Sequence, residues 1–130
     1  MKKIVISTIA AAVAVWAMDF VIHGMLLMPL YQQTESMWRP MAQMNMTLNL
    51  AVTVVLSLLF VLFYDQTVSG KNLQSGLRFG AWYGALAGVS MGIGSYVYLP
   101  IPKALALGWL VGTFVEMVVV GAIVGQLSKD

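Results

Sequence analysis

Four long apolar runs dominate the chain, and short polar stretches separate them. They cover Ile4–Leu30, Met46–Tyr64, Phe79–Leu99 and Ala104–Leu127. A helix needs about 20 mostly apolar residues to cross the hydrocarbon core of a bilayer. The pattern therefore predicts an all-α fold: a four-transmembrane-helix antiparallel bundle that forms one domain over residues 1–130. The first run is longer than a span needs, so we expect it to tilt or to bend near Pro29.

Composition supports a membrane protein. Hydrophobic residues make up 60% of the chain and charged residues only 9%, whereas a soluble domain averages about 25% charged residues. The net charge of +2 is small and scattered, so no nucleic-acid partner is expected. The absence of cysteine excludes disulfides, thiolate metal sites and a cysteine nucleophile. The lipid bilayer is the expected surrounding.

The distribution of basic residues predicts an orientation. Four spans put both termini on one side, and the positive-inside rule assigns the side richer in Lys and Arg to the cytoplasm. Arg39 and Lys103 fall on one side. The other side receives Lys2, Lys3, Lys71, Arg78 and Lys129. We therefore expect a multi-pass protein of the inner (cytoplasmic) membrane with both termini in the cytoplasm.

The beginning of the chain has some features of a signal peptide. Two lysines precede an apolar run, and Val15-Trp16-Ala17 has small residues at its outer positions, as cleavage sites do. The apolar run continues to Leu30, however, which is long enough to span a bilayer. We expect a retained signal anchor, with cleavage of the first helix as the alternative.

Three ionisable side chains interrupt these apolar runs: Asp19 and His23 in the first, and Glu116 in the fourth. A charge in the bilayer centre costs roughly 2.5–3.5 kcal/mol on insertion scales, so such residues usually face the interior of a bundle. Asp19 and His23 are four residues apart and share a helix face, which allows a carboxylate–imidazole hydrogen bond. At 1.5 Å per residue, Asp19 and Glu116 both lie roughly 16–18 Å below the outer edge.

The second run adds a polar row at the same depth. Its members are four residues apart: Asn45, Asn49, Thr53 and Ser57. Asn49 and Thr53 lie at a depth similar to that of the acids, so we expect a polar patch of Asp19, His23, Glu116, Asn49 and Thr53. The patch could hold or relay a proton or an ion. The alternative is a neutral, hydrogen-bonded cluster that only fixes helix register.

Glycines are arranged for close helix packing. Residues four apart share one helix face, and small residues let membrane helices approach each other. The third run carries Gly76, Gly80, Gly84, Gly88 and Gly92 in such a row. In the fourth run Gly108 and Gly112 form a row that continues to Glu116. We expect these glycines to form helix contacts, and Glu116 to point toward a neighbouring helix.

Two metal sites are weaker alternatives. His23, Asp19 and Glu116 could together bind zinc, manganese or iron(II). The outer loop also carries a methionine cluster, and thioethers suit copper(I). Its members are Met37, Met41, Met44 and Met46. Methionine is also a flexible apolar filler, which needs no metal. No cofactor can be named from the sequence.

No hydrolase triad, phosphate loop or dinucleotide fingerprint is present, so an enzyme is not expected. We expect a protein that moves a proton, an ion or a small solute through the polar patch. The alternatives are a non-catalytic accessory or structural subunit of a larger membrane complex, and a metal-binding membrane protein. Four spans enclose little volume, so a homo-oligomer or a larger membrane complex is expected.

Several short motifs support this architecture through a resemblance. They are Asp19-Phe20-x-x-His23-Gly24, Tyr31, Met37-Trp38-Arg39-Pro40, Gly76-Leu77-Arg78-x-Gly80 and Leu99-Pro100-Ile101-Pro102. Over most of its length the chain resembles a group of small four-helix membrane proteins of bacteria and archaea to which no function is assigned. The resemblance implies the four-helix architecture and no mechanism. In size and charge placement alone the chain is similar to small multidrug transporters, whose membrane glutamate lies in the first helix instead.

Overall fold

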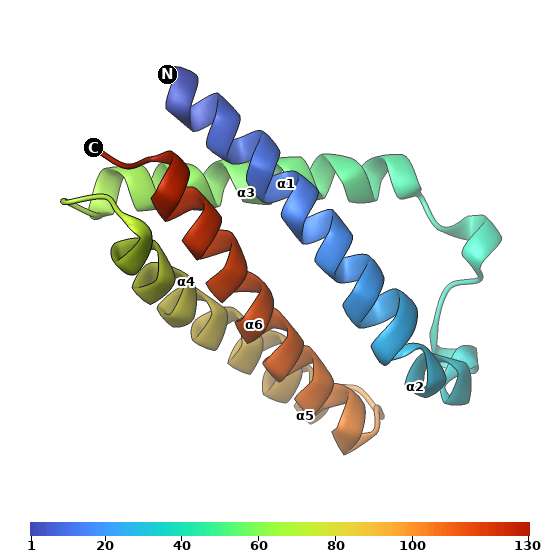
Figure 1. Ribbon diagram of the computed structural model, residues 1–130. Helices are drawn as coiled ribbons and strands as arrows, with labels where there is room; N and C mark the ends of the chain where they lie inside the picture. Colours follow the sequence, from blue (N-terminus) through green and yellow to red (C-terminus); the bar gives the residue numbers. More distant parts are fainter.

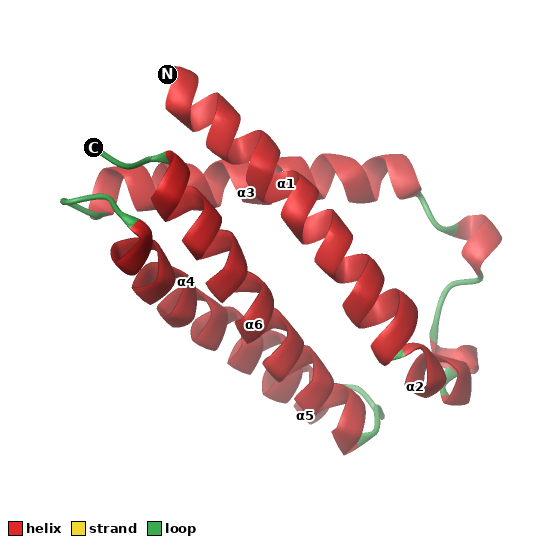
Figure 2. Ribbon diagram, in the orientation of Figure 1, coloured by secondary structure: helices red, strands yellow, loops and turns green.

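The computed structural model describes all residues from Met1 to Asp130, and every regular element is a helix (Figure 2). Four long helical segments follow one another along the chain (Figure 1). The elements, in order, are α1 (Lys2–Val21), η1 (Ile22–Leu26), α2 (Met28–Gln33), η2 (Glu35–Met37), η3 (Met41–Gln43), α3 (Met46–Thr67), α4 (Leu73–Gly88), η4 (Val89–Gly94), α5 (Ser95–Tyr98) and α6 (Lys103–Leu127).

The all-α prediction is confirmed, and three helices are long and apolar enough to cross a membrane. These are Lys2–Leu26, Met46–Thr67 and Lys103–Leu127. The third predicted span, Phe79–Leu99, falls in a helical segment that is divided among α4, η4 and α5. A bundle of four spans therefore stays a prediction.

The first helical segment breaks at Leu27, close to Pro29, where the sequence predicts a bend. Ile22–Leu26 forms a π-helix, in which the Leu27 N–H donates to the Ile22 carbonyl oxygen at 2.8 Å. Pro29 then occupies the first turn of α2. Proline has no N–H and its ring clashes with the preceding turn, so a helix that meets one must widen or break.

The third segment begins earlier than its apolar run. Asn72 caps α4 by accepting from the Ser75 N–H at 3.0 Å, and the Ser75 hydroxyl in turn accepts from the Asn72 N–H. This reciprocal capping box satisfies N–H groups that would otherwise lack a partner at the helix start. The helix therefore starts at Leu73, six residues before the predicted start at Phe79.

The glycine row of α4 lies directly against α6, and the two helices run antiparallel (Figure 1). A Cβ atom at Gly76 or Gly80 would meet a backbone carbonyl oxygen, that of Gly121 or Met117 respectively. At Gly88 it would lie 2.7 Å from the Leu110 oxygen, and at Gly92 2.5 Å from the Ala106 oxygen. Only glycine permits this separation of the two backbones, so the two helices form a rigid hairpin.

Two hydrophobic clusters hold the other helices to this hairpin. The first joins α1, α3 and α6 through Ala11, Phe60, Val61, Tyr64, Val120 and Val124. The second joins η1 and the break at Leu27 to the start of α6 and lacks α3. Its buried members are Ile22, Leu27, Ile101, Leu105 and Ala106.

The direction of α3 follows from its packing, because only its second half contributes to a hydrophobic cluster. It crosses α1 instead of running beside it, and its first half points away from α4 and α6 (Figure 1). Met46, Leu48 and Leu50 in that half are exposed. The divergence opens a space between the two clusters, and the polar residues lie there.

Candidate functional site

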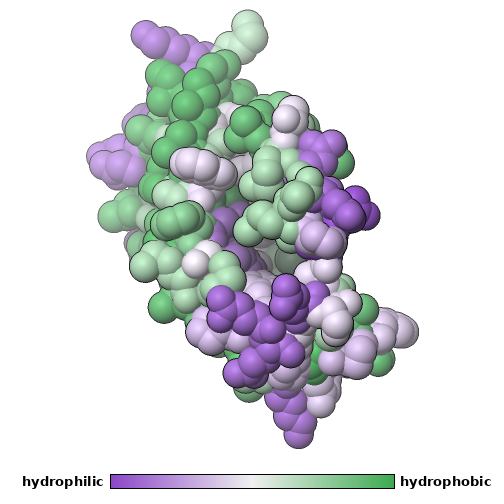
Figure 3. Space-filling model, turned by 90° about the vertical axis from the view of Figure 1, so that its right-hand side faces the viewer, coloured by the Kyte–Doolittle hydropathy of each residue, from purple (hydrophilic) through white to green (hydrophobic).

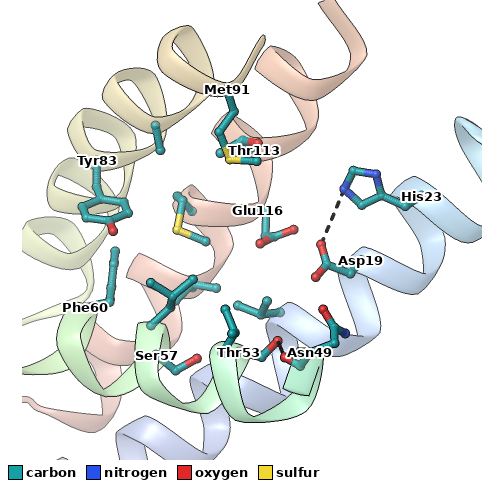
Figure 4. A pocket seen from close by; sticks show the side chains of 16 residues that line it. Asp19, His23, Asn49, Thr53, Ser57, Phe60, Tyr83, Met91, Thr113 and Glu116 are labelled. Atoms are coloured by element: carbon teal, nitrogen blue, oxygen red, sulfur yellow. Dashed lines mark hydrogen bonds and ion pairs between the residues drawn. The ribbon is translucent and has the colours of Figure 1, made fainter. Parts of the chain in front are cut away.

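A pocket of about 560 Å³ lies between α1, α3, α4 and α6. All five residues of the predicted patch line it, although they come from three helices (Figure 4). They are Asp19 and His23 from the first helical segment, Asn49 and Thr53 from α3, and Glu116 from α6. Seen from the side of the Thr34–Asn45 connection, the surface has a hollow bordered by both hydrophilic and hydrophobic residues (Figure 3).

Helix packing turns Glu116 toward this pocket. Its row-mates Gly108 and Gly112 lie against Leu27 and Ile22 of the first segment, where a Cβ atom would come within 2.6 Å and 3.0 Å of those side chains. Glu116, one turn further along α6, is only 8% exposed. Its carboxyl group points toward that of Asp19 (Figure 4). Two facing carboxyl groups can hold one proton between them, or a cation.

His23 has a different hydrogen-bond partner from the one expected. Its Nε2 lies 3.7 Å from Asp19 Oδ1, which is too long for a hydrogen bond. Its Nδ1 lies 2.6 Å from the Tyr31 hydroxyl, and that hydroxyl also accepts from Trp109 Nε1 at 2.6 Å. The π-helix and the break at Leu27 bring Tyr31 back to the face of His23.

The tautomer of His23 decides the direction of its hydrogen bond to Tyr31. An indole N–H can only donate, so the Tyr31 oxygen accepts from Trp109 and has its own hydrogen free to donate to His23 Nδ1. With the Tyr31 hydroxyl as the donor, the proton of the neutral ring sits on Nε2, the nitrogen that faces Asp19. With the ring as the donor, the proton sits on Nδ1 and Nε2 is free to accept one. Burial raises the pKa of Tyr31, the Trp109 hydrogen bond opposes this, and the charge of Asp19 adds to it. Tyr31 therefore stays neutral in the physiological range.

The pocket contains no Lys or Arg side chain. Its only basic group is His23, and that side chain is 41% exposed, as is Asp19. The acidic groups of the pocket thus have no permanent counter-charge from the protein. Neutralisation must come from a proton, from His23 when it is protonated, or from a bound cation.

One buried hydroxyl in the pocket lacks a partner. Ser57 is 4% exposed and lines the pocket, and its Oγ makes no hydrogen bond. Its neighbour in the polar row, Thr53, donates to the Asn49 carbonyl oxygen at 3.0 Å. An unpaired buried hydroxyl costs free energy, so a hydrogen bond from Ser57 to a polar group in the pocket would be favourable.

Some residues of the site do not follow from the apolar pattern. Tyr83 and Met91 line the pocket from α4 and η4. Tyr83 is aromatic and Met91 apolar, so the sequence does not distinguish either from the other residues of the spans. Tyr31 could be found only by knowing that the helix breaks at Leu27. Ser57 belongs to the polar row that the sequence does show.

Neither of the two predicted sets of metal ligands is arranged as a preformed metal site. No group of three or more His, Asp or Glu side chains is close enough to hold one ion. Among the methionines, Met37 packs against the second hydrophobic cluster. Met41, Met44 and Met46 are exposed along the connection and at the start of α3.

Taken together, the fold and the site define an all-helical chain with three helices able to cross a membrane and a polar pocket between them. No protein-family model, characterised protein or solved structure matches this chain.

Proposed function

We propose that this protein crosses the inner membrane four times and moves a proton or a small solute through the pocket. The observation that carries this proposal is the convergence of Asp19, His23, Asn49, Thr53 and Glu116 on one cavity in an otherwise apolar chain. Ionisable groups between membrane helices usually belong to a substrate or proton pathway, since their insertion is costly.

The fourth span in this proposal is the segment from Leu73 to Tyr98. Its three elements follow without an intervening loop. At about 1.5 Å per residue such a segment exceeds the ~30 Å hydrocarbon thickness. The π-helix Val89–Gly94 interrupts the regular hydrogen bonding but keeps the backbone groups paired, as lipid requires.

The position of the termini supports an even number of spans. Lys3 Nζ donates to the Lys129 carbonyl oxygen at 2.6 Å, and the Ser7 and Ser128 hydroxyls lie 3.3 Å apart. The Lys71 N–H donates to Asp130 at 3.0 Å, which brings the α3–α4 turn to the same end. Lys2, Lys3, Lys71 and Lys129 therefore lie together, as expected for the cytoplasmic side.

The proposed proton path begins at the carboxyl pair. Glu116 and Asp19 face each other, and Asp19 also faces the Nε2 of His23. His23 can accept a proton from the pair at Nε2 when its own ring proton is on Nδ1, where it donates to the Tyr31 oxygen, and Asp19 stabilises the imidazolium that forms. His23 and Asn49 lie toward the end of the pocket where α3 diverges, so this end is the proposed outer mouth.

A proton-flux assay tests the proposal. The protein is reconstituted in vesicles that contain a pH-sensitive dye, and a membrane potential drives proton movement. We expect Glu116→Gln and Asp19→Asn to lower the flux at least about tenfold, because neither amide can carry the proton. Glu35→Gln is the matched control, since Glu35 is an exposed acid on the connection and outside the pocket.

Folding must be followed in parallel. Both isosteric variants should insert and elute as the wild type does, because their side-chain volumes hardly change. Wild-type flux in both variants would contradict the proposal and would favour an accessory subunit of a larger membrane complex.

A further inference from the structure

The lining of the pocket indicates what kind of solute it accepts. We propose that it binds an organic ammonium cation with an apolar body, its charged head at Glu116 and Asp19 and its body against Phe60 and Tyr83. This inference names a substrate class for the proposed function and rests on it.

The charge of the pocket selects the sign of the ligand. Two carboxyl groups face each other there, and no Lys or Arg side chain lines the cavity. An anion would be repelled, and a neutral molecule would gain no attraction from the carboxylate charge. A cation replaces the proton that the pair otherwise holds, so proton and ligand compete for the same oxygens.

The wall opposite the acids is apolar and aromatic. Phe60 and Tyr83 form an edge-to-face pair with ring centroids 5.1 Å apart, and both line the pocket (Figure 4). Met91 and Met117 add thioethers beside them. Aromatic rings pack against an apolar or aromatic ligand body, and methionine adapts to ligands of different shape.

The volume of the cavity and its unpaired hydroxyl favour an organic cation over a metal ion as the ligand. The cavity of about 560 Å³ matches the range for drug-sized ligands. A bare metal ion would fill little of it and would find no group of three acidic or imidazole ligands. The unpaired Ser57 hydroxyl, buried in the same wall as Phe60, offers a hydrogen bond to a polar substituent of the ligand.

The probe for this inference is benzyltrimethylammonium, and its uncharged carbon isostere neopentylbenzene is the matched control ligand. Binding is measured by titration calorimetry with the full-length protein in lipid nanodiscs. We expect saturable binding of the cation and none of the isostere. Affinity should rise with pH, as the competing proton is lost.

Three variants locate the ligand. Glu116→Gln should weaken binding at least about tenfold, since the charge is lost. Tyr83→Leu should weaken it by about 2- to 12-fold, the range of an aromatic contact with the ligand body. Glu35→Gln should leave it unchanged.

Equal binding of the two probes, wild-type affinity in Glu116→Gln, or displacement of the cation by sodium alone would each overturn the inference. The two proposals fail separately. Proton flux without ammonium binding would remove only the substrate class, whereas binding without any flux would remove transport and leave a binding protein.

Discussion

At the scale of single residues, Tyr31 links parts of the chain that the sequence keeps far apart. Its hydroxyl joins His23 of the first helical segment to Trp109 of α6. Its ring also lies edge-on to Trp38, with centroids 5.5 Å apart. One phenol thereby fixes the orientation of the imidazole at the pocket and attaches the Thr34–Asn45 connection to the hairpin.

Tyr31→Phe should destabilise the protein by about 1–3 kcal/mol, because Trp109 Nε1 loses its acceptor and His23 its partner. Thermal unfolding in detergent measures the loss. The control is Tyr98→Phe, since the Tyr98 side chain is exposed and makes no hydrogen bond. The double variant Tyr31→Phe/Trp109→Phe should cost less than the sum of its single variants. Additive losses would mean that the two residues act independently.

At the scale of elements, the contact between α4 and α6 depends on the absence of side chains. A methyl group at Gly80 would press on the Met117 carbonyl, a backbone atom that cannot move without separating the helices. At Gly94 the nearest atom would be 3.8 Å away, in ordinary contact. The two positions therefore form a matched pair.

We expect Gly80→Ala to lower the stability by about 1–3 kcal/mol, since overpacking outweighs the better helix propensity of alanine. Gly94→Ala should be neutral, or stabilising by up to about 1 kcal/mol. Chemical unfolding followed by circular dichroism gives both values. A loss at Gly94 as large as that at Gly80 would show that backbone freedom, and not packing, is the reason for glycine.

The helices could be predicted from the sequence because each coincides with an apolar run, and the break near Pro29 follows from proline chemistry. The start of α4 at Leu73 was missed because it depends on the cap formed by Asn72 and Ser75 and not on hydropathy. The direction of α3 could not be predicted either. It depends on which half of that helix finds neighbours, and apart from the polar row of Asn49, Thr53 and Ser57 both halves of the helix are mostly apolar.

For the site, depth along each helix brought Asp19, Glu116 and Thr53 into one predicted patch without any knowledge of packing. The expected hydrogen bond from His23 to Asp19 is not formed. His23 bonds to Tyr31 instead, which reaches it only because of the π-helix. Tyr83 carries no signal that distinguishes it from an interface aromatic. Its role at the pocket depends on the α4–α6 hairpin.

At the scale of the whole molecule, the adjacent termini make the topology testable. The native chain has no cysteine, so single cysteines can be introduced without background. Ser36, Ser69 and Lys129 are all exposed and lie outside the long helices. With four spans, a membrane-impermeant thiol reagent should label Ser36→Cys in intact cells, and should label Ser69→Cys and Lys129→Cys only after the membrane is opened. Labelling of both Ser36→Cys and Lys129→Cys in intact cells would contradict four spans.

The contacts between Lys3 and Lys129 and between Ser7 and Ser128 also bear on how the protein is made. Ends this close can be joined by a short peptide, and the chain can be reopened in the exposed turn at Ser69 and Gly70. Such a circular permutant would keep every helix contact but would emerge from the ribosome with α4 first. The signal-like beginning of α1 would then lie in the interior of the chain, which separates its part in membrane insertion from its part in the finished pocket.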